Sequence, residues 1–190
     1  MSSSISPSEE RSALNTKDTA SCLVAGLARN NRCLGVFPAD YPIALQDDST
    51  TNNSVAWVMN TAPSDHPGLH WVAYYRKAES KCAPEFFDSV GLTPAEYALL
   101  PKGDAVARDS LQSLDSNVCG QYCVFYLCQR SRGLSRTQVL ALLKSMPVKE
   151  RERRLIAYCA AIVNGPMKGS GIAGCQCCTS PKCFCTHQHH

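Results

Sequence analysis

Four side chains of this 190-residue chain are of the types that carry out acyl transfer: His70, Asp88, Gln112 and Cys119. Cys119 stands where the polar stretch SNV gives way to the apolar run YCVFYLC, which is typical of a buried helix. We expect Ser116 or Asn117 to cap this helix and Cys119 to lie in its first turn. The unpaired N–H groups and the dipole at that end favour a thiolate, the reactive form of cysteine.

Gly120 is expected to let a substrate backbone approach the sulfur, because glycine has no Cβ. The alternative reading of Cys119 is a buried thiol that acts only as a small apolar side chain.

His70 and Asp88 lie in two segments that read as strands, HWVAYYRK and APEFFDS, joined by the polar stretch KAESK. A hairpin centred near Glu79 would place His70 directly opposite Asp88 on one face of the sheet. A carboxylate there would orient the imidazole and stabilise its charged form. The separate alternatives are a solvated histidine at a strand edge and an aspartate that caps a turn.

Gln112 ends a further strand-like run, VARDSLQ, seven residues before Cys119. Its side-chain amide and the backbone N–H of Cys119 could together donate to the oxyanion of a tetrahedral intermediate. Taken alone, Gln112 would be read as an ordinary polar residue at a strand end.

The four segments NRCLGVFPADYPI, VMNTAPSDHPGLHWVAYY, FFDSVG and LQSLDSNVCGQYCVFYL resemble, in this order, motifs of the adenain-like cysteine proteases. This family comprises the maturation proteases of adenoviruses and their relatives in viruses and virus-like mobile elements. The resemblance runs from about Asn31 to Gln129, and Asp88 stands where adenain itself has Glu.

The resemblance implies an α+β, papain-like fold of the adenain type, with a mixed sheet flanked by helices and the nucleophile at a helix N-terminus. It implies that Cys119 attacks, His70 is the general base, Asp88 orients the base and Gln112 completes the oxyanion hole. Trp71 would pack beside the imidazole, although core packing explains an aromatic residue there as well.

By the same resemblance, the protein is an endopeptidase that cuts precursor polypeptides at Gly-containing sites during virion maturation. It would need no cofactor for the chemistry, with DNA or a peptide as a possible activator, and would act as a monomer in the host nucleus or cytoplasm and in the virion. The alternatives are a peptidase that processes ubiquitin-like modifiers and a non-catalytic binding protein. A caspase reading fails because HW and VCGQ are not caspase signatures.

Composition predicts one domain, over residues 13–166, since 44% of the residues are apolar and no repeat is visible. Residues 1–12 are polar and Ser-rich, which predicts disorder, and no secretory signal or membrane span is apparent, which predicts an intracellular protein. The net charge is only +3, and KERERR alternates in sign, which favours a solvated helix face over a nucleic-acid stripe.

Several other segments are expected to supply packing elements. A helix capped by Asp18 or Thr19 should run to about Asn30 or Asn31, and SVAWVMNTA should form a buried strand. SRTQVLALLKSM and KERERRLIAYCAAIV read as two late helices. His66 is interpreted as an exposed turn residue and not as an alternative base. Burial or no special role is expected for six other cysteines: Cys22, Cys33, Cys82, Cys123, Cys128 and Cys159.

Residues 167–190 form a tail rich in Gly, Ser, Cys and His. A small zinc site is feasible there, although the spacing matches no common finger. Disulfide or acyl-group chemistry and a tail without a fixed role are the alternatives. The candidate ligands are Cys175, Cys178, Cys183, Cys185, His187 and His189.

The stretch MKGSG, from Met167 to Gly171, fits the description of sites cut by the family that the chain resembles. The resulting hypothesis is self-cleavage between Ser170 and Gly171, which would release a Cys-rich peptide. The released peptide would either be a counterpart of the family's peptide activator or have no further use. An accidental match in a Gly/Ser-rich linker is the alternative.

Overall fold

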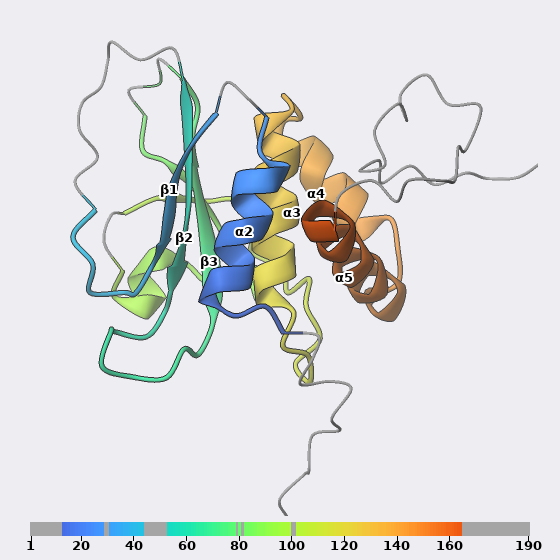
Figure 1. Ribbon diagram of the computed structural model, residues 1–190, viewed down its shortest axis with the longest axis horizontal. Coiled ribbons are helices and arrows are strands. Elements are labelled where there is room, and N and C mark those ends of the chain that lie inside the picture. The colour runs from blue at the N-terminus through green and yellow to red at the C-terminus, as the bar shows by residue number, and fades with distance from the viewer. Residues whose placement is uncertain are drawn as a thin grey trace, which may run out of the picture.

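The computed structural model describes residues 13–28, 31–43, 53–78, 80, 82–99 and 102–164. They form a five-stranded mixed sheet with helices against one face (Figure 1), which confirms the predicted α+β class. The spatial order of the strands is the order in the chain: β1 (Asn31–Phe37), β2 (Ser54–Asn60), β3 (Trp71–Arg76), β4 (Glu85–Phe87) and β5 (Asp104–Ala105). The outer pairs β1–β2 and β4–β5 are parallel, and the two inner pairs are antiparallel.

The helix that begins at Cys119, α3 (Cys119–Ser131), lies against the sheet, and all of its residues are buried. Around it pack α2 (Thr16–Gly26), α4 (Arg136–Lys144) and α5 (Val148–Asn164), as Figure 1 shows. Since α3 is enclosed on every side, its first turn is held rigidly relative to the sheet.

Each central strand sends alternate side chains to two separate cores, as the period of a strand requires. On β3, Ala73 and Tyr75 pack toward the helices, whereas Val72 and Tyr74 pack on the other face. A short 3-10 helix, η1 (Pro94–Tyr97), covers part of that second core. Both faces are therefore buried, which explains why SVAWVMN reads as a continuous apolar strand.

The predicted helix caps need two corrections. Asn15, and not Asp18 or Thr19, caps α2, because its side chain accepts a hydrogen bond from the Asp18 N–H at 2.9 Å, and the helix ends at Gly26. Val118 is the N-cap of α3 and supplies no side-chain hydrogen bond, so Ser116 and Asn117 are not caps.

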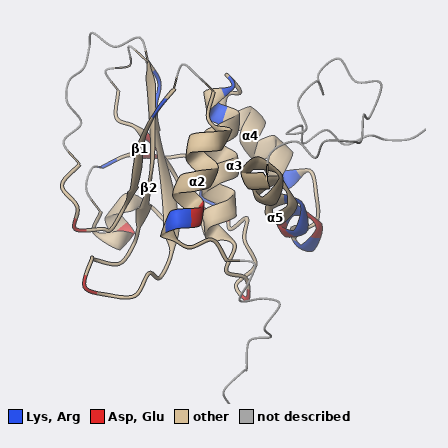
Figure 2. Cartoon of the chain, viewed as in Figure 1, with Lys and Arg blue, Asp and Glu red and all other residues tan. Residues whose placement is uncertain are grey.

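The KERERR segment is only partly the solvated face that its charges predict. Figure 2 shows positive and negative residues side by side at the start of α5, where Glu150 pairs with Arg153 and Arg154. Arg151, however, is 94% buried and donates to the carbonyl oxygens of Leu111 and Met146. Helical periodicity turns this one arginine inward, where backbone carbonyls accept hydrogen bonds from its two terminal nitrogens.

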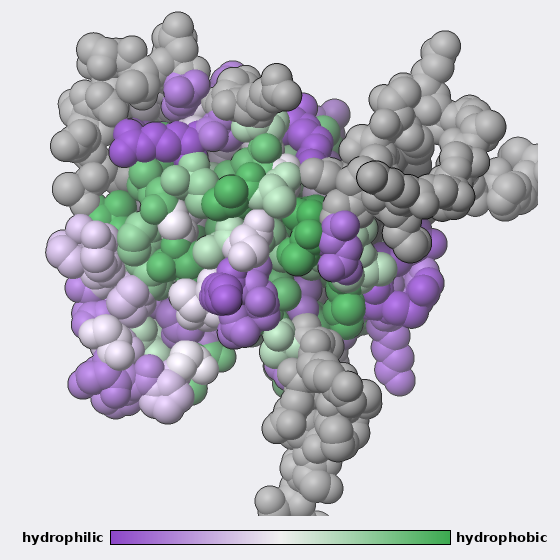
Figure 3. Space-filling view, viewed as in Figure 1, coloured by the Kyte–Doolittle hydropathy of each residue, from purple (hydrophilic) through white to green (hydrophobic). Residues whose placement is uncertain are grey.

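Apolar residues gather on the face formed by α2 and β1 (Figure 3). Val24 of α2 is 75% exposed. None of the described helices is long and apolar enough to cross a membrane.

Candidate active site

His70 is held by a turn that connects β2 to β3. The side-chain oxygen of Asn60, at the end of β2, accepts hydrogen bonds from the N–H groups of Ala62 (2.8 Å) and Leu69 (3.2 Å). The Thr61 N–H donates to the His70 carbonyl at 2.9 Å. Through these two hydrogen bonds, the buried side chain of Asn60 holds both ends of the turn and thereby the position of the imidazole.

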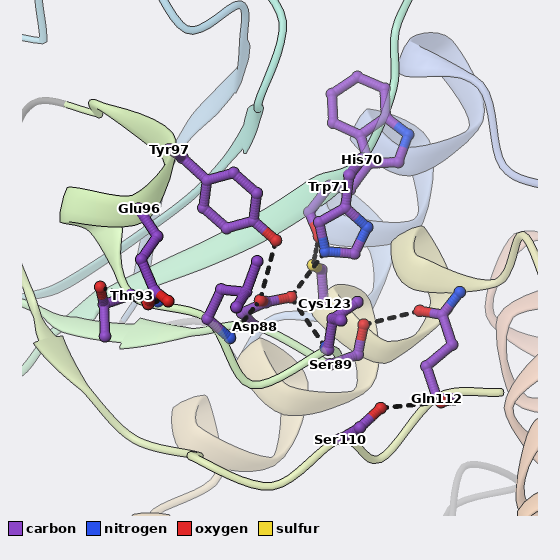
Figure 4. A network of polar contacts seen from close by, with 12 residues as sticks. His70, Trp71, Asp88, Ser89, Thr93, Glu96, Tyr97, Ser110, Gln112 and Cys123 are labelled. Carbon is purple, nitrogen blue, oxygen red and sulfur yellow. Dashed lines mark hydrogen bonds and ion pairs between the residues drawn. The ribbon is translucent and has the colours of Figure 1, made fainter. Parts of the chain in front are cut away.

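Asp88 lies directly after β4, and its fully buried carboxylate accepts four hydrogen bonds (Figure 4). One oxygen, Oδ1, accepts from His70 Nε2 (2.6 Å) and the Val90 N–H (3.0 Å); the other, Oδ2, accepts from the Leu92 N–H (2.8 Å) and the Tyr97 hydroxyl (3.0 Å). Burial alone would raise the pKa of Asp88, but the hydrogen bond from His70 and the backbone N–H groups lower it below its usual range. The carboxyl group is therefore ionised at neutral pH.

The contact between His70 and Asp88 arises from a strand register that differs from the predicted one. The hairpin centred near Glu79 would pair Ala73 with Glu85, whereas the structure pairs Ala73 with Phe87. The shift is two residues, and a shift of two keeps every side chain on its own face. His70 and Asp88 both lie just outside the paired segments, where they meet without being directly opposite.

His70 lines the same cleft as Cys119. Because Nε2 is bound to Asp88, the other ring nitrogen, Nδ1, is the atom available to the sulfur. Burial would lower the pKa of His70, but the hydrogen bonds to the side chains of Asp88 and Cys119, together with their charges, raise it from 6.5 to about 9. The imidazolium form consequently predominates at neutral pH.

Cys119 is the first residue of α3, as its sequence context predicts. Its backbone N–H has no intrahelical acceptor, and no side chain caps the helix. The sulfur therefore lies at the uncapped, positive end of the helix dipole. Cys119 is 7% exposed and lines a cleft, which argues against a purely structural thiol.

Gln112 lies in a loop and not at the end of a strand, because β5 ends at Ala105 and VARDSLQ has no strand of its own. Its Oε1 accepts from the Ser89 hydroxyl at 2.7 Å, and its Nε2 donates to the Ser116 carbonyl at 2.7 Å. A side-chain amide has two N–H donors, so one remains for a ligand in the cleft, which Gln112 lines.

The cleft has a volume of about 410 Å³. His70, Gln112 and Cys119 open into it together with Trp71 and with Ala13, Leu14, Asn15, Thr16, Gly68, Leu69, Ser116 and Asn117. The segment that leads into α2 thus forms one wall, although residues 13–16 carry no sequence signal for such a role.

Gly120 does not leave the space that was expected for a substrate. A Cβ at this position would lie 3.2 Å from the Leu14 Cβ and 3.6 Å from Trp71 Cδ1. The absence of a side chain instead lets α2 and the indole of Trp71 pack against the first turn of α3.

The structure adds residues to the site that the sequence motifs do not predict. Tyr97 and Asn60 contact or orient the His70–Asp88 pair, and Ser89 holds Gln112. Glu152 of α5 accepts from the Ser113 N–H and the Ser116 hydroxyl, both at 2.9 Å, and so anchors the loop before Cys119. Asn60 and Ser89 lie inside motifs that the resemblance had marked, whereas Tyr97 and Glu152 lie outside them.

His66 is exposed and pairs with Asp65 at 2.9 Å, as predicted for a turn residue. Cys22, Cys123, Cys128 and Cys159 are buried, as predicted, whereas Cys33 is half-buried and Cys82 is exposed.

The segments 1–12 and 167–190 lie outside the described residues. The hypothesis of cleavage between Ser170 and Gly171 and the candidate metal ligands Cys175, Cys178, Cys183, Cys185, His187 and His189 fall in the second of them. Within the part of the chain that the structure describes, no group of three or more His, Cys, Asp or Glu residues could hold a metal ion.

No protein-family model matches the chain, and no curated protein matches it either. Among solved structures, the ASFV pS273R protease is similar at 24% sequence identity and a TM-score of 0.41. The match covers 55% of this chain, and this chain spans 43% of that protein.

Proposed function

We propose that this protein is a cysteine endopeptidase of the adenain type, with Cys119 as its nucleophile. The observation that carries the proposal is the buried carboxylate of Asp88, hydrogen-bonded at 2.6 Å to an imidazole that lines the same cleft as Cys119. A structural cysteine has no need of an oriented imidazole, whereas an activated thiolate does.

In the first half of the reaction, the Cys119 thiolate attacks the scissile carbonyl carbon, and a C–S bond forms. The carbonyl π electrons move to the oxygen, which can accept hydrogen bonds from the Cys119 backbone N–H and from the free N–H of Gln112. The intermediate then collapses, the C–N bond breaks, and the His70 imidazolium gives its proton to the leaving amine.

In the second half, neutral His70 takes a proton from water, whose oxygen attacks the thioester carbon. A second tetrahedral intermediate forms and breaks at the C–S bond, which releases the acid and restores the thiolate. Asp88 stabilises the charged imidazole each time it forms and keeps the ring in one orientation. Side chains and water supply every group in this sequence, so the chemistry needs no cofactor.

We place the substrate among precursor polypeptides of a virus or virus-like element, cut at Gly-containing sites during virion maturation. The support for this is the set of sequence motifs around His70, Asp88 and Cys119. The cleft that Cys119 lines lies between residues 13–16 and the turn before His70.

The test is labelling and turnover with a peptide that copies the chain's own Met167–Gly171 sequence. A vinyl sulfone that carries Met-Lys-Gly-Ser should label the wild type, and a fluorogenic peptide spanning Met-Lys-Gly-Ser-Gly should be cut. Both signals should be lost in Cys119→Ala and in His70→Ala.

Two matched variants make the test specific. Cys82→Ala removes an exposed thiol, and His66→Ala removes an exposed histidine; both should behave as the wild type. Equal labelling of Cys119→Ala, or full labelling rates in a folded His70→Ala protein, would contradict the peptidase assignment and favour a binding protein.

A further inference from the structure

Tyr97 contacts both members of the His70–Asp88 pair. Its hydroxyl donates to Asp88 Oδ2 at 3.0 Å, and its ring is stacked on the imidazole with a centroid distance of 6.0 Å and an interplanar angle of 29°. Figure 4 shows the phenol pointing at the carboxylate from the side of η1. No motif that the sequence analysis singled out includes this residue.

The position of Tyr97 is set by the local structure of η1. Thr93 caps the helix, its side chain and its N–H each bind Glu96 Oε2 at 2.7 Å, and buried Pro94 opens the first turn. The Leu99 N–H closes the segment by donating to the Pro94 carbonyl at 2.9 Å. A proline and a capping box restrict the backbone, so the phenol is held in one place.

The four hydrogen bonds to Asp88 differ in whether their donor is a backbone group or a side chain. The donors of Val90 and Leu92 are backbone groups of the turn that follows Asp88, and they persist whatever side chains are present. Tyr97 is the donor that comes from the neighbouring η1 element. It occupies Oδ2, so that Oδ1 faces Nε2 of His70.

We infer that Tyr97 is a positioning residue. Its hydroxyl orients the Asp88 carboxylate, and its phenol ring confines the imidazole ring of His70. This inference deepens the proposed function and rests on it for its catalytic meaning. The hydroxyl also shares the negative charge of the carboxylate, and so moderates how strongly Asp88 holds the proton of His70.

The ionisable groups around the pair come from several elements. His70 faces Asp88, Tyr97 and, from α3, Cys119; the charge of Asp88 is also felt by Cys123 of α3 and by Glu96 of η1. Burial, followed by the nearby Asp88 charge, raises the pKa of Tyr97 above its ordinary value. The phenol therefore stays protonated, and able to donate, throughout the range in which His70 titrates.

The first experiment is an NMR titration of His70 in full-length Cys119→Ala protein, with and without Tyr97→Phe. Phenylalanine keeps the ring and removes the donor, which leaves Asp88 a stronger acceptor for the imidazolium. We expect the midpoint of His70 to rise by roughly half a pH unit. An unchanged or lowered midpoint would overturn the inference.

The second experiment is kinetic. In protein that retains Cys119, Tyr97→Phe should lower kcat about 10-fold, because the pair is less well aligned, and should leave KM unchanged, because Tyr97 does not line the cleft. A change confined to KM, or none at all, would contradict a positioning role.

Two controls separate the possible failures. Tyr41→Phe alters a half-exposed tyrosine that is stacked on Phe37, and it should change neither the His70 midpoint nor kcat. Because the titration needs no turnover, an inactive wild type would remove the proposed function and still leave the role of Tyr97 to be decided by the His70 midpoint.

Discussion

The hydroxyl of Ser89 donates to Oε1 of Gln112 at 2.7 Å, although 22 residues lie between them in the chain. The Ser89 carbonyl also accepts the N–H groups of Leu111 (2.7 Å) and Gln112 (3.0 Å). Ser89, the neighbour of Asp88, thus anchors Gln112, the residue proposed for the oxyanion hole. The turn after β4 therefore positions both the carboxylate that orients His70 and the amide proposed to bind the oxyanion.

Ser89→Ala should therefore impair catalysis, although Ser89 is not proposed to contact the substrate. Gln112 would lose the contact that sets its amide orientation, and we expect kcat to fall about 10-fold. Gln112→Ala, which removes the donor itself, should cost roughly 10²- to 10³-fold. Steady-state kinetics on the peptide substrate measures both. Ser145→Ala, which removes a hydroxyl near the end of α4, is the control, and equal effects of Ser89→Ala and Ser145→Ala would refute the link.

The activity should have an alkaline limit set by His70. Its pKa is raised from 6.5 to about 9 in the folded protein, and the imidazolium is the form that protonates the leaving amine. The value of kcat/KM should therefore hold through neutral pH and fall as the pH rises through about 9. A profile measured from pH 6 to pH 10 checks this, and an alkaline decline centred near 6.5 would be incompatible with the His70–Asp88 contact.

Asp88→Asn should move that limit to lower pH. The amide keeps the shape of the carboxylate but not its charge, so the pKa of His70 loses its main upward influence and falls. We expect kcat to drop by at least roughly 10²-fold, with the alkaline limb shifted toward neutral pH. Asp65→Asn, next to exposed His66, is the matched control and should leave the profile unchanged.

The same contacts predict how stability depends on pH. Because the folded-state pKa of His70 is raised, its contribution to the free energy of unfolding is fully present below about pH 6.5 and is lost as the pH rises through about 9. Urea unfolding of the wild type and of His70→Ala, at pH 6 and pH 10, measures this contribution. The difference between the two proteins should be larger at pH 6; an equal difference at both values would contradict the assigned shift.

Gly91 and Gly133 both have positive φ, and substitution by alanine should destabilise the protein more at Gly91 than at Gly133. Gly91 (φ 90°) would place a Cβ 3.0 Å from the Arg108 backbone, whereas Gly133 (φ 92°) has nothing within 4 Å. Gly133→Ala should cost about 1–2 kcal/mol for the backbone conformation alone. Gly91→Ala should cost about 1–3 kcal/mol more because of the close contact. Denaturant unfolding compares them, and equal losses would show that the contact is relieved by a small shift.

Residue types and spacing were enough to predict the parts of this protein that depend on local structure. An apolar run after a polar stretch placed Cys119 in the first turn of a helix. Segments rich in aromatic residues placed His70 at the start of one strand and Asp88 at the end of the next, each one residue away from the strand that forms. The hairpin register was two residues off, because turn length and not strand composition sets it. The error preserved the face, since strand side chains alternate with a period of two.

Tertiary structure decided the rest. The hydrogen bond from Tyr97 to Asp88, the anchoring of Gln112 by Ser89 and the wall of the cleft made by residues 13–16 all join segments that are distant in the chain or that carry no local pattern. A tyrosine in η1 looks like any half-buried aromatic residue until the fold brings its hydroxyl to a buried carboxylate. Periodicity and capping are local and can be read along the chain, whereas a hydrogen bond between distant segments exists only after packing has fixed where each segment lies.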